Sequence, residues 1–138
     1  MIILDSNVLS AFMRDVPDAK VISWMDRQIA SSIWTTAITI FEIESGLQNL
    51  APGKKRTMLS EQFEKLLQQM EHRIAVFDDN AARLAANLNA KRRRAGQIGE
   101  MRDTMIAGIV LSRGASLATR NVSHFSDIGA RVINPWVA

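Results

Sequence analysis

Short apolar runs alternate along this chain with longer segments in which apolar residues recur every three or four positions. A short apolar run bounded by polar residues is typical of a buried strand, whereas the longer period is typical of an amphipathic helix. The runs predict strands at 2–4, 33–36, 74–77, 116–118 and 131–133. Strands that alternate with helices favour a parallel sheet that is covered on both faces. We therefore expect an α/β fold, a three-layer α/β/α domain around a central parallel sheet.

Helical periods fill the segments between these strands. A short helix is expected near 8–13, and Pro17 suits the first turn of a second helix, with Ile22, Met25 and Ile29 at helical spacing. Further apolar stripes are Ile40, Ile43, Leu47 and Leu50, ended by Pro52-Gly53; Leu59, Phe63, Leu66, Leu67 and Met70; and Leu84, Ala85 and Leu88, behind an N-cap at Asp78 or Asp79. A last helix is expected over 102–113, where Gly114 ends it.

The composition favours a single folded domain over residues 1–138. No apolar run approaches the roughly 20 residues that a membrane-spanning helix needs, and the N-terminus lacks the basic segment of a signal peptide. The absence of cysteine excludes disulfides, thiolate zinc sites and cysteine nucleophiles. We expect a cytoplasmic protein without a membrane partner.

The net charge of +3 and the two basic runs, 54–56 and 91–94, are compatible with a polyanionic partner without requiring one. Such runs are usually solvated helix ends, and phosphate contact is the alternative. Tyrosine is absent and aromatic residues make up 6% of the chain. This scarcity disfavours a base-stacking platform of the kind found in single-strand RNA-binding modules.

Four polar residues are expected at the edge of the sheet where the strands end. Asp5 follows the first strand and Asn121 the fourth, Glu42 lies in the helix after the second, and Asp103 opens a helix. Ligands of open α/β sheets bind beyond the carboxyl ends of the strands. Carboxylates gathered there raise one another's pKa unless a cation joins them. Oxygen ligands suit Mg²⁺ or Mn²⁺, and the lack of cysteine disfavours zinc.

Each of these residues also has an ordinary structural interpretation. Asp5 could only cap the helix that follows it, and Asp103 could only complement a helix dipole. Glu42 and Glu44 flank the apolar stripe of their helix from opposite sides, so either could be solvated. Asn121 could be a turn residue. Structural roles are also expected for three further polar residues, Thr104, Thr119 and His124.

Four segments, IILDSNVLS, TIFEIESG, RDTMIA and LATRNVSHF, together resemble the signature segments of PIN-domain proteins in order and spacing. The resemblance is strongest to VapC-type (FitB-like) toxins of bacterial toxin–antitoxin pairs, and it spans nearly the whole chain. It implies a metal-dependent endoribonuclease with a PIN-like fold that hydrolyses RNA with Mg²⁺ or Mn²⁺. It also implies a homodimer that a small cognate antitoxin inhibits.

The resemblance assigns roles residue by residue. Asp5, Glu42 and Asp103 match the three main acidic positions and are expected to be catalytic residues and metal ligands. Asn121 stands where many relatives have a fourth acid and is expected to be a further metal ligand. Asn7 matches the position that steadies the acids by hydrogen bonding. With three carboxylates instead of four, we expect one well-bound ion and a second that binds weakly.

Two rival interpretations remain. Haloacid-dehalogenase phosphatases and response-regulator receivers also place an aspartate after the first strand. The former need D-x-D, but Asn7 occupies the second position, and receivers need a lysine after the last strand, which the chain lacks. The other rival is a catalytically silent PIN-like module that binds a protein or a nucleic acid, which Asn121 favours because it removes one carboxylate from the expected site.

Overall fold

A parallel sheet of five strands lies at the centre of the protein, in the order β3-β2-β1-β4-β5. The computed structural model describes residues 1–138. The strands are β1 (Ile2–Leu4), β2 (Ile33–Thr36), β3 (Ile74–Ala75), β4 (Ser116–Ala118) and β5 (Val132–Ile133). In the central strand β1, Ile2 is in register with Ile33 of β2 on one side and with Ser116 of β4 on the other. Residues that follow β1, β2 and β4 therefore leave the sheet at the same edge.

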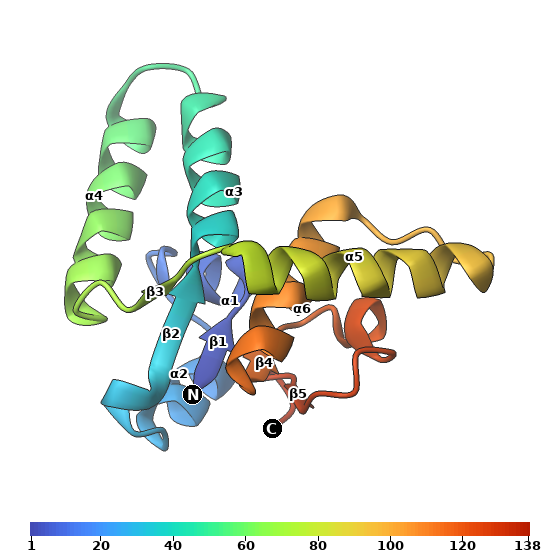
Figure 1. The fold of residues 1–138 in the computed structure, drawn as a ribbon. Helices are drawn as coiled ribbons and strands as arrows, with labels where there is room; N and C mark the ends of the chain where they lie inside the picture. Colours follow the sequence, from blue (N-terminus) through green and yellow to red (C-terminus); the bar gives the residue numbers. More distant parts are fainter.

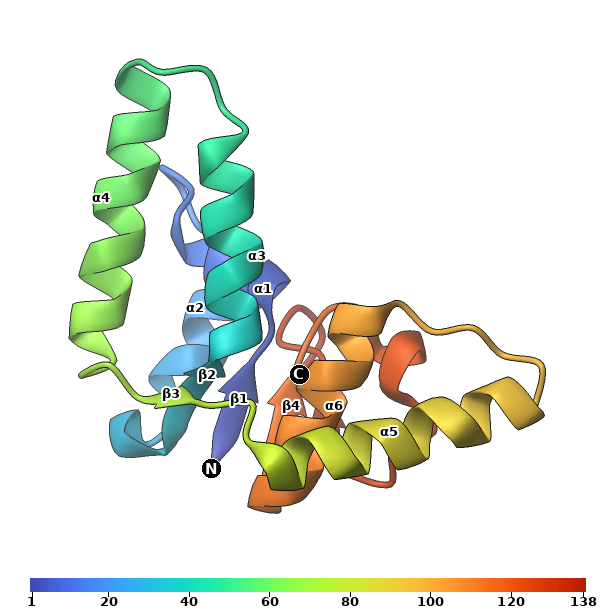
Figure 2. The ribbon, with the colours of Figure 1, turned by 45° about the horizontal axis from the view of Figure 1, so that its top comes forward.

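Six α-helices connect and cover these strands. They are α1 (Ser6–Phe12), α2 (Ala19–Asp26), α3 (Ala37–Gln48), α4 (Lys54–Gln69), α5 (Asp79–Arg94) and α6 (Met101–Arg113). Two 3₁₀ turns, η1 (Ala30–Ser32) and η2 (Val122–Phe125), precede β2 and follow β4. Figures 1 and 2 show that α3 and α4 stand side by side as one pair, while α5 lies across α6 as another.

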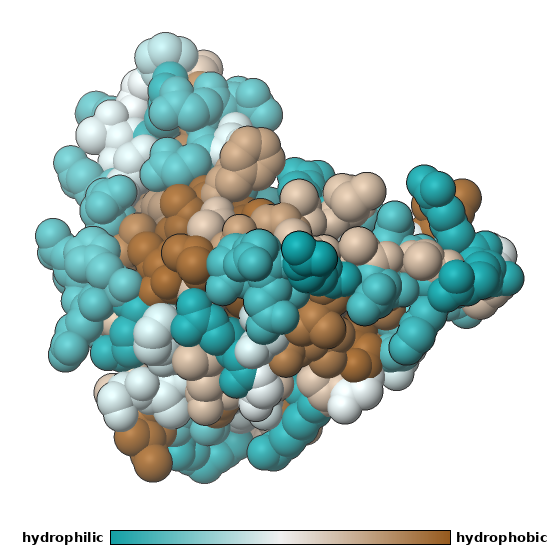
Figure 3. Space-filling model, in the orientation of Figure 1, coloured by the Kyte–Doolittle hydropathy of each residue, from teal (hydrophilic) through white to brown (hydrophobic).

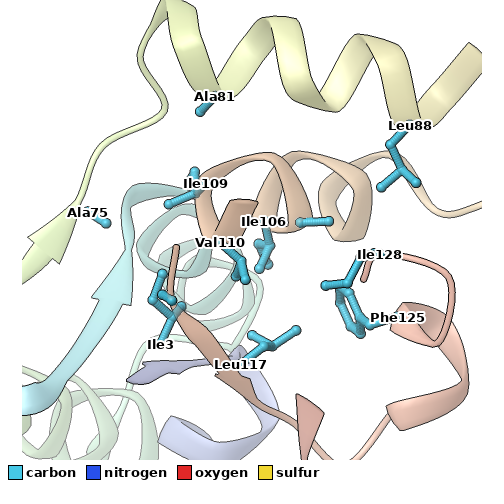
Figure 4. Packing of buried hydrophobic residues seen from close by; sticks show 12 residues of the cluster. Ile3, Ala75, Ala81, Leu88, Ile106, Ile109, Val110, Leu117, Phe125 and Ile128 are labelled. Atoms are coloured by element: carbon cyan, nitrogen blue, oxygen red, sulfur yellow. The ribbon is translucent and has the colours of Figure 1, made fainter. Parts of the chain in front are cut away.

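Alternation along β1 divides the core into two halves, because successive side chains of a strand point to opposite faces of the sheet. Ile3 joins a cluster with Ile106 and other residues of α5, α6 and the C-terminal segment (Figure 4). Leu4 joins a second cluster with Leu9 of α1 and Phe63 of α4. Both faces of the sheet are thus covered by helices, and the predicted three-layer α/β/α fold with a parallel sheet is confirmed.

Local sequence signals set most of the helix ends. Asp18 caps α2, Thr36 caps α3 and Asp78 caps α5, each by accepting a backbone N–H of the first turn. Gly114 ends α6 in the left-handed region, with φ of 59°, where a residue without Cβ is favoured. Of the two caps considered for the fifth helix, Asp78 and Asp79, the structure has Asp78, and the predicted stop at Gly114 is confirmed.

The apolar stripe predicted for the second helix was only partly right, because Met25 packs against the apolar core whereas Ile29 does not. Val21 and Trp24 are the buried residues of α2, whereas Ile29 lies beyond its end and is 74% exposed. Pro17 precedes the N-cap Asp18 and is therefore outside the first turn. In a helix this short two apolar stripes are possible, and the large indole of Trp24 makes its face the one that is buried.

Three other predicted boundaries were too long. The strand expected over 74–77 ends at Ala75, the strand expected over 131–133 starts at Val132, and α3 ends before Leu50. β3 and β5 are the edge strands of the sheet, where a strand has a neighbour on one side only and pairing stops as soon as that neighbour turns away.

The single domain over 1–138 stays a prediction.

Hydrophilic residues cover the top of the α3–α4 pair and the far end of α5 in the view of Figure 3. The two basic runs of the sequence lie at these ends, at the start of α4 and at the end of α5. None of the helices combines the length and the apolar character needed to cross a membrane.

Gly108 lets α5 and α6 approach each other closely. A Cβ at this position would come within 2.4 Å of the Ala81 carbonyl oxygen and within 2.8 Å of the Ala85 Cβ. Both contacts are shorter than real side chains make, and a backbone carbonyl cannot rotate out of the way. Gly46 in α3 provides a contrast, because nothing lies within 4 Å of the corresponding position.

We predict that Gly108→Ala lowers the free energy of unfolding by about 1–3 kcal/mol through overpacking. Gly46→Ala, in an open helical position, should raise it by about 0.5–1 kcal/mol. Urea denaturation of the two variants beside the parent measures both values. A Gly108→Ala protein as stable as the parent would mean that the two helices have room to separate.

Candidate active site

Asp5 lies directly after the central strand, and the residue is 2% exposed. Its Oδ1 accepts the Ser6 backbone N–H at 2.9 Å, and its Oδ2 accepts the Thr119 hydroxyl at 2.8 Å. Burial raises the pKa of Asp5, the hydrogen bond from Thr119 opposes that rise, and the negative charge of Asp103 adds to it. Asp5 therefore caps α1, which is the structural role considered for it from the sequence. It also places a buried carboxylate at the edge of the sheet.

Asn7 and Thr119 connect the ends of β1 and β4 around this carboxylate. Asn7 Nδ2 lies 3.2 Å from both Asp5 Oδ2 and Thr119 Oγ1, and Asn7 Oδ1 accepts the Arg120 backbone N–H at 2.9 Å. Thr119 Oγ1 also accepts the Asn121 backbone N–H at 3.1 Å. The hydrogen bond from Asn7 to Asp5 is the one that the resemblance implied, while the stronger role of Thr119 was missed.

Glu42 reaches the same edge of the sheet from α3, which follows β2. Its Oε1 is buried and has no hydrogen-bond partner. Burial raises the pKa of Glu42 to about 7, with further contributions from the charge of Asp5 and, more weakly, of Asp103. The positive charge of Arg102 acts in the opposite direction. A cation would stabilise a half-buried carboxylate that lacks a hydrogen-bond partner and lies in the field of other acids.

Asp103 lies in the first turn of α6, with 16% of its side chain exposed. Its Oδ2 is 3.0 Å from Nδ1 of His124, which comes from η2. Its backbone N–H donates to Oε2 of Glu100, the residue that caps α6. The sequence interpretation gave His124 only a structural role and did not single out Glu100. Asn121 precedes η2 and is exposed, and its backbone is held by Thr119 rather than by a carboxylate.

The basic run 91–94 is not uniformly solvated, which corrects the usual interpretation of such runs. Arg92 is 5% exposed. Its Nε and Nη2 each donate to Asp127 at 2.8 Å, its Nη1 donates to Thr104 Oγ1 at 3.0 Å, and its Nη2 also donates to the His124 carbonyl at 2.9 Å. These bonds tie the end of α5 to the start of α6 and to η2, the elements that carry Asp103 and His124. Lys91, Arg93 and Arg94 are exposed.

Two cavities differ in their relation to the acids. A polar cavity of about 460 Å³ adjoins the site and is lined by Arg92, Glu100, Asp103 and His124 among others. A mainly apolar cavity of about 380 Å³ lies among residues of α1, α2 and α4 and touches none of Asp5, Glu42 and Asp103. The polar cavity adjoins one acid of the site, because Asp103 lines it, whereas Asp5 and Glu42 do not.

The donor chemistry fits a hard divalent cation. The three acids predicted from the sequence act on one another electrostatically from three different elements, and one of them has a buried oxygen without a partner. Oxygen donors of this kind suit Mg²⁺ or Mn²⁺. Three or more acidic or histidine side chains do not already stand at metal-binding spacing. The residues therefore fit the ion chemically, and side-chain adjustment has to accompany its binding.

Comparison with known proteins places the chain in a family. The model of the PIN domain matches residues 2–130. The chain belongs to the PIN-domain family. Within it, the similarity is to the VapC and FitB toxins of toxin–antitoxin systems.

Three relatives match this PIN-domain chain almost from end to end. The plasmid stability protein StbB of Pseudomonas syringae pv. tomato is 39% identical, and each chain is covered completely. The VapC ribonuclease Y4jK of Sinorhizobium fredii is 35% identical, with 99% of this chain and 98% of the relative covered. The crystal structure of FitAcB from Neisseria gonorrhoeae superimposes with a TM-score of 0.90 at 32% identity, with both chains covered completely.

We predict that the metal-free protein loses stability as the pH rises from about 4.5 to about 7, because the folded state raises the pKa of Glu42 from 4.5 to about 7. The folded protein holds the proton of the Glu42 carboxyl more tightly than the unfolded chain does. The loss of stability from ionising Glu42 is therefore absent at low pH and complete above about pH 7. Glu42→Gln should flatten this part of the profile in thermal melts with EDTA.

Glu44→Gln on the same helix is the matched control and should leave the profile as it is. Residual pH dependence in Glu42→Gln is expected from Asp5, whose pKa is also raised. A parent and a Glu42→Gln variant with parallel stability profiles across this range would show that Glu42 ionises freely in the fold.

Proposed function

We propose that this chain is a divalent-metal-dependent endoribonuclease and the toxin of a bacterial toxin–antitoxin pair. The observation that carries the proposal is the buried carboxylate of Asp5 beside Glu42, whose Oε1 lacks a partner, at the edge where the strands end. Two like charges held this way are destabilising without a cation. The name of the relative Y4jK, a VapC ribonuclease, supports RNA as the substrate.

In this proposal Asp5, Glu42 and Asp103 hold the ion, which is Mg²⁺ or Mn²⁺. When bound, the ion supplies Lewis-acid activation of water and neutralises charge on the phosphate. Thr119 and Asn7 fix the orientation of the Asp5 carboxylate by their hydrogen bonds. Burial of Asp5 keeps bulk water away from it and strengthens its attraction for the ion.

Asn121 is proposed as a further oxygen ligand without charge. Its exposed position beside Thr119 leaves its side chain free to turn toward the acids. An amide in place of a fourth carboxylate weakens the affinity for a second ion, because hard-cation affinity depends on ligand charge. The same substitution is what favours the rival function, a catalytically silent binding module, so the two functions have to be separated by a cleavage assay.

We further propose a homodimer whose cognate antitoxin is a small protein. The family to which the chain belongs is that of toxin–antitoxin systems. The acidic site would attract a basic residue of the antitoxin, since complementary charge stabilises such contacts. Expression of the protein should then arrest growth, and co-expression of the cognate antitoxin should restore it.

We predict that purified protein cleaves RNA with Mg²⁺ or Mn²⁺ but not with EDTA, and that Asp5→Asn lowers the rate by at least about 100-fold. Loss of an outer-shell partner of a metal ligand already costs about 10–100-fold in affinity or activity. Asparagine is as good an N-cap as aspartate, so α1 should be kept. Gel analysis of a labelled RNA measures the rate.

Asp18→Asn is the matched control, because Asp18 is also an N-cap but lies at the start of α2. It should cleave as fast as the parent. A parent protein that binds RNA and cuts none of it with either ion would favour the silent module. Equal cleavage by Asp5→Asn and the parent would remove Asp5 from the site.

A further inference from the structure

Arg120 is anchored through its backbone to the hydrogen-bond network that also holds Asp5. It follows Thr119 at the end of β4, and its backbone N–H donates to Asn7 Oδ1 at 2.9 Å. Asn7 in turn donates to Asp5. The position of the Arg120 backbone is therefore fixed relative to the acidic site, although its side chain is exposed.

The side chain of Arg120 is held by an aromatic ring. Its guanidinium lies over Trp136, with 4.8 Å from Cζ to the ring centroid. Trp136 is half-buried, packs against the apolar cluster on the α1 side of the sheet, and donates its backbone N–H to Asn134 Oδ1 at 3.0 Å. Stacking of this kind uses the flat face of the guanidinium and leaves its N–H donors at the rim free.

Those donors have no acceptor within the protein. No carboxylate lies within 4 Å of Arg120, whereas Arg73, Arg92 and Arg102 each have an acidic partner. Arg102, whose positive charge lowers the pKa of Glu42, is held by Glu100 at 3.0 Å. Arg120 is thus a pre-oriented cation with unused donors at the edge of the sheet that carries the acids.

The order of the strands places Arg120 and the acids along one edge of the sheet. Glu42 follows β2, Asp5 follows β1, Arg120 follows β4 and Trp136 follows β5, in the spatial order of the strands. A polyanion held at the metal site continues along this edge, where a fixed cation can bind a further phosphate. The planar fork of arginine matches two oxygens of a phosphate.

We propose that Arg120, held on Trp136, binds a backbone phosphate of the RNA on the β4–β5 side of the phosphate that is cleaved. This inference rests on the proposed function, because it takes RNA to be the substrate. The competing explanation is structural: Arg120 only shields the ring of Trp136 from water. The two differ in what happens to the salt dependence of RNA binding when the charge is removed.

The test measures binding of a fluorescein-labelled, mixed-sequence single-stranded RNA of twelve nucleotides by anisotropy at several salt concentrations. Asp5→Asn protein is the background, so that the probe stays intact. Each phosphate neutralised on a single strand contributes about 0.7 to the slope of log K against log salt. Arg120→Gln should lower the slope by about 0.7 and weaken binding at low salt by roughly 10-fold.

Two further variants separate charge from packing. Arg120→Lys keeps the charge and loses the fork, so it should retain the slope with a smaller loss of affinity. Arg113→Gln is the matched control, because Arg113 also lies over a tryptophan, Trp34, at 6.0 Å. It stands at the opposite end of α6 from Asp103, about 15 Å away along the helix, and its loss should leave the slope unchanged.

The proposal is overturned if Arg120→Gln keeps the slope of the background protein, whether or not its melting temperature falls. It is also overturned if Arg113→Gln loses as much slope as Arg120→Gln. Cleavage by the parent is measured separately. If the parent protein cleaves RNA and Arg120→Gln binds RNA as tightly as the background protein does, this inference alone is refuted. If the parent protein never cleaves RNA, the proposed function is refuted.

Discussion

The buried carboxylate of Asp5 is the constraint around which the rest of the site is arranged. It stands at the end of the central strand, almost without exposure, and is held by Ser6, Thr119 and Asn7. Burial of a carboxylate is costly unless hydrogen bonds or a cation compensate for the lost hydration. The hydrogen bonds supply part of that compensation, and the raised pKa of Asp5 indicates that they do not supply all of it.

The neighbouring acids increase the electrostatic cost instead of relieving it. Asp103 on α6 raises the pKa of Asp5, and both Asp5 and Asp103 raise the pKa of Glu42 on α3. A fold selected for stability alone would place a partner beside Glu42 Oε1, which has none. Strain of this kind concentrates at functional sites. A divalent ion bound by the acids would offset the rest of this electrostatic cost.

Much of the frame could be predicted from the sequence because it depends on local signals. Apolar runs located all five strands, and Asp78 and Gly114 marked helix ends by their own chemistry. The position of Asp5 followed from its place after the first strand, whereas Glu42 was chosen over Glu44 by the family resemblance; the charge of Asp5 does raise the pKa of Glu42. The roles of these residues as ligands remain a proposal.

The parts that could not be predicted depend on partners far apart in the chain. Arg92 looked like one of four solvated basic residues, but Asp127, 35 residues away, makes it a buried tie between helices. Thr119 is 114 residues from Asp5, so nothing local marked its hydroxyl as the donor to that carboxylate. The burial of Trp24 instead of Ile29 was decided by packing against other helices, which a helical period does not specify.

The most direct test of the central claim is calorimetric titration of Mn²⁺ into the protein in buffers of different ionisation enthalpy. Binding to carboxylates requires their deprotonation and so releases protons. With the pKa of Glu42 at about 7, the account predicts release of close to one proton per ion at about pH 6, and almost none at about pH 8.5. In Glu42→Gln the release at the lower pH should be largely lost. Absence of Mn²⁺ binding, or binding heats that are independent of the buffer at about pH 6, would contradict the claim that the ion completes this site.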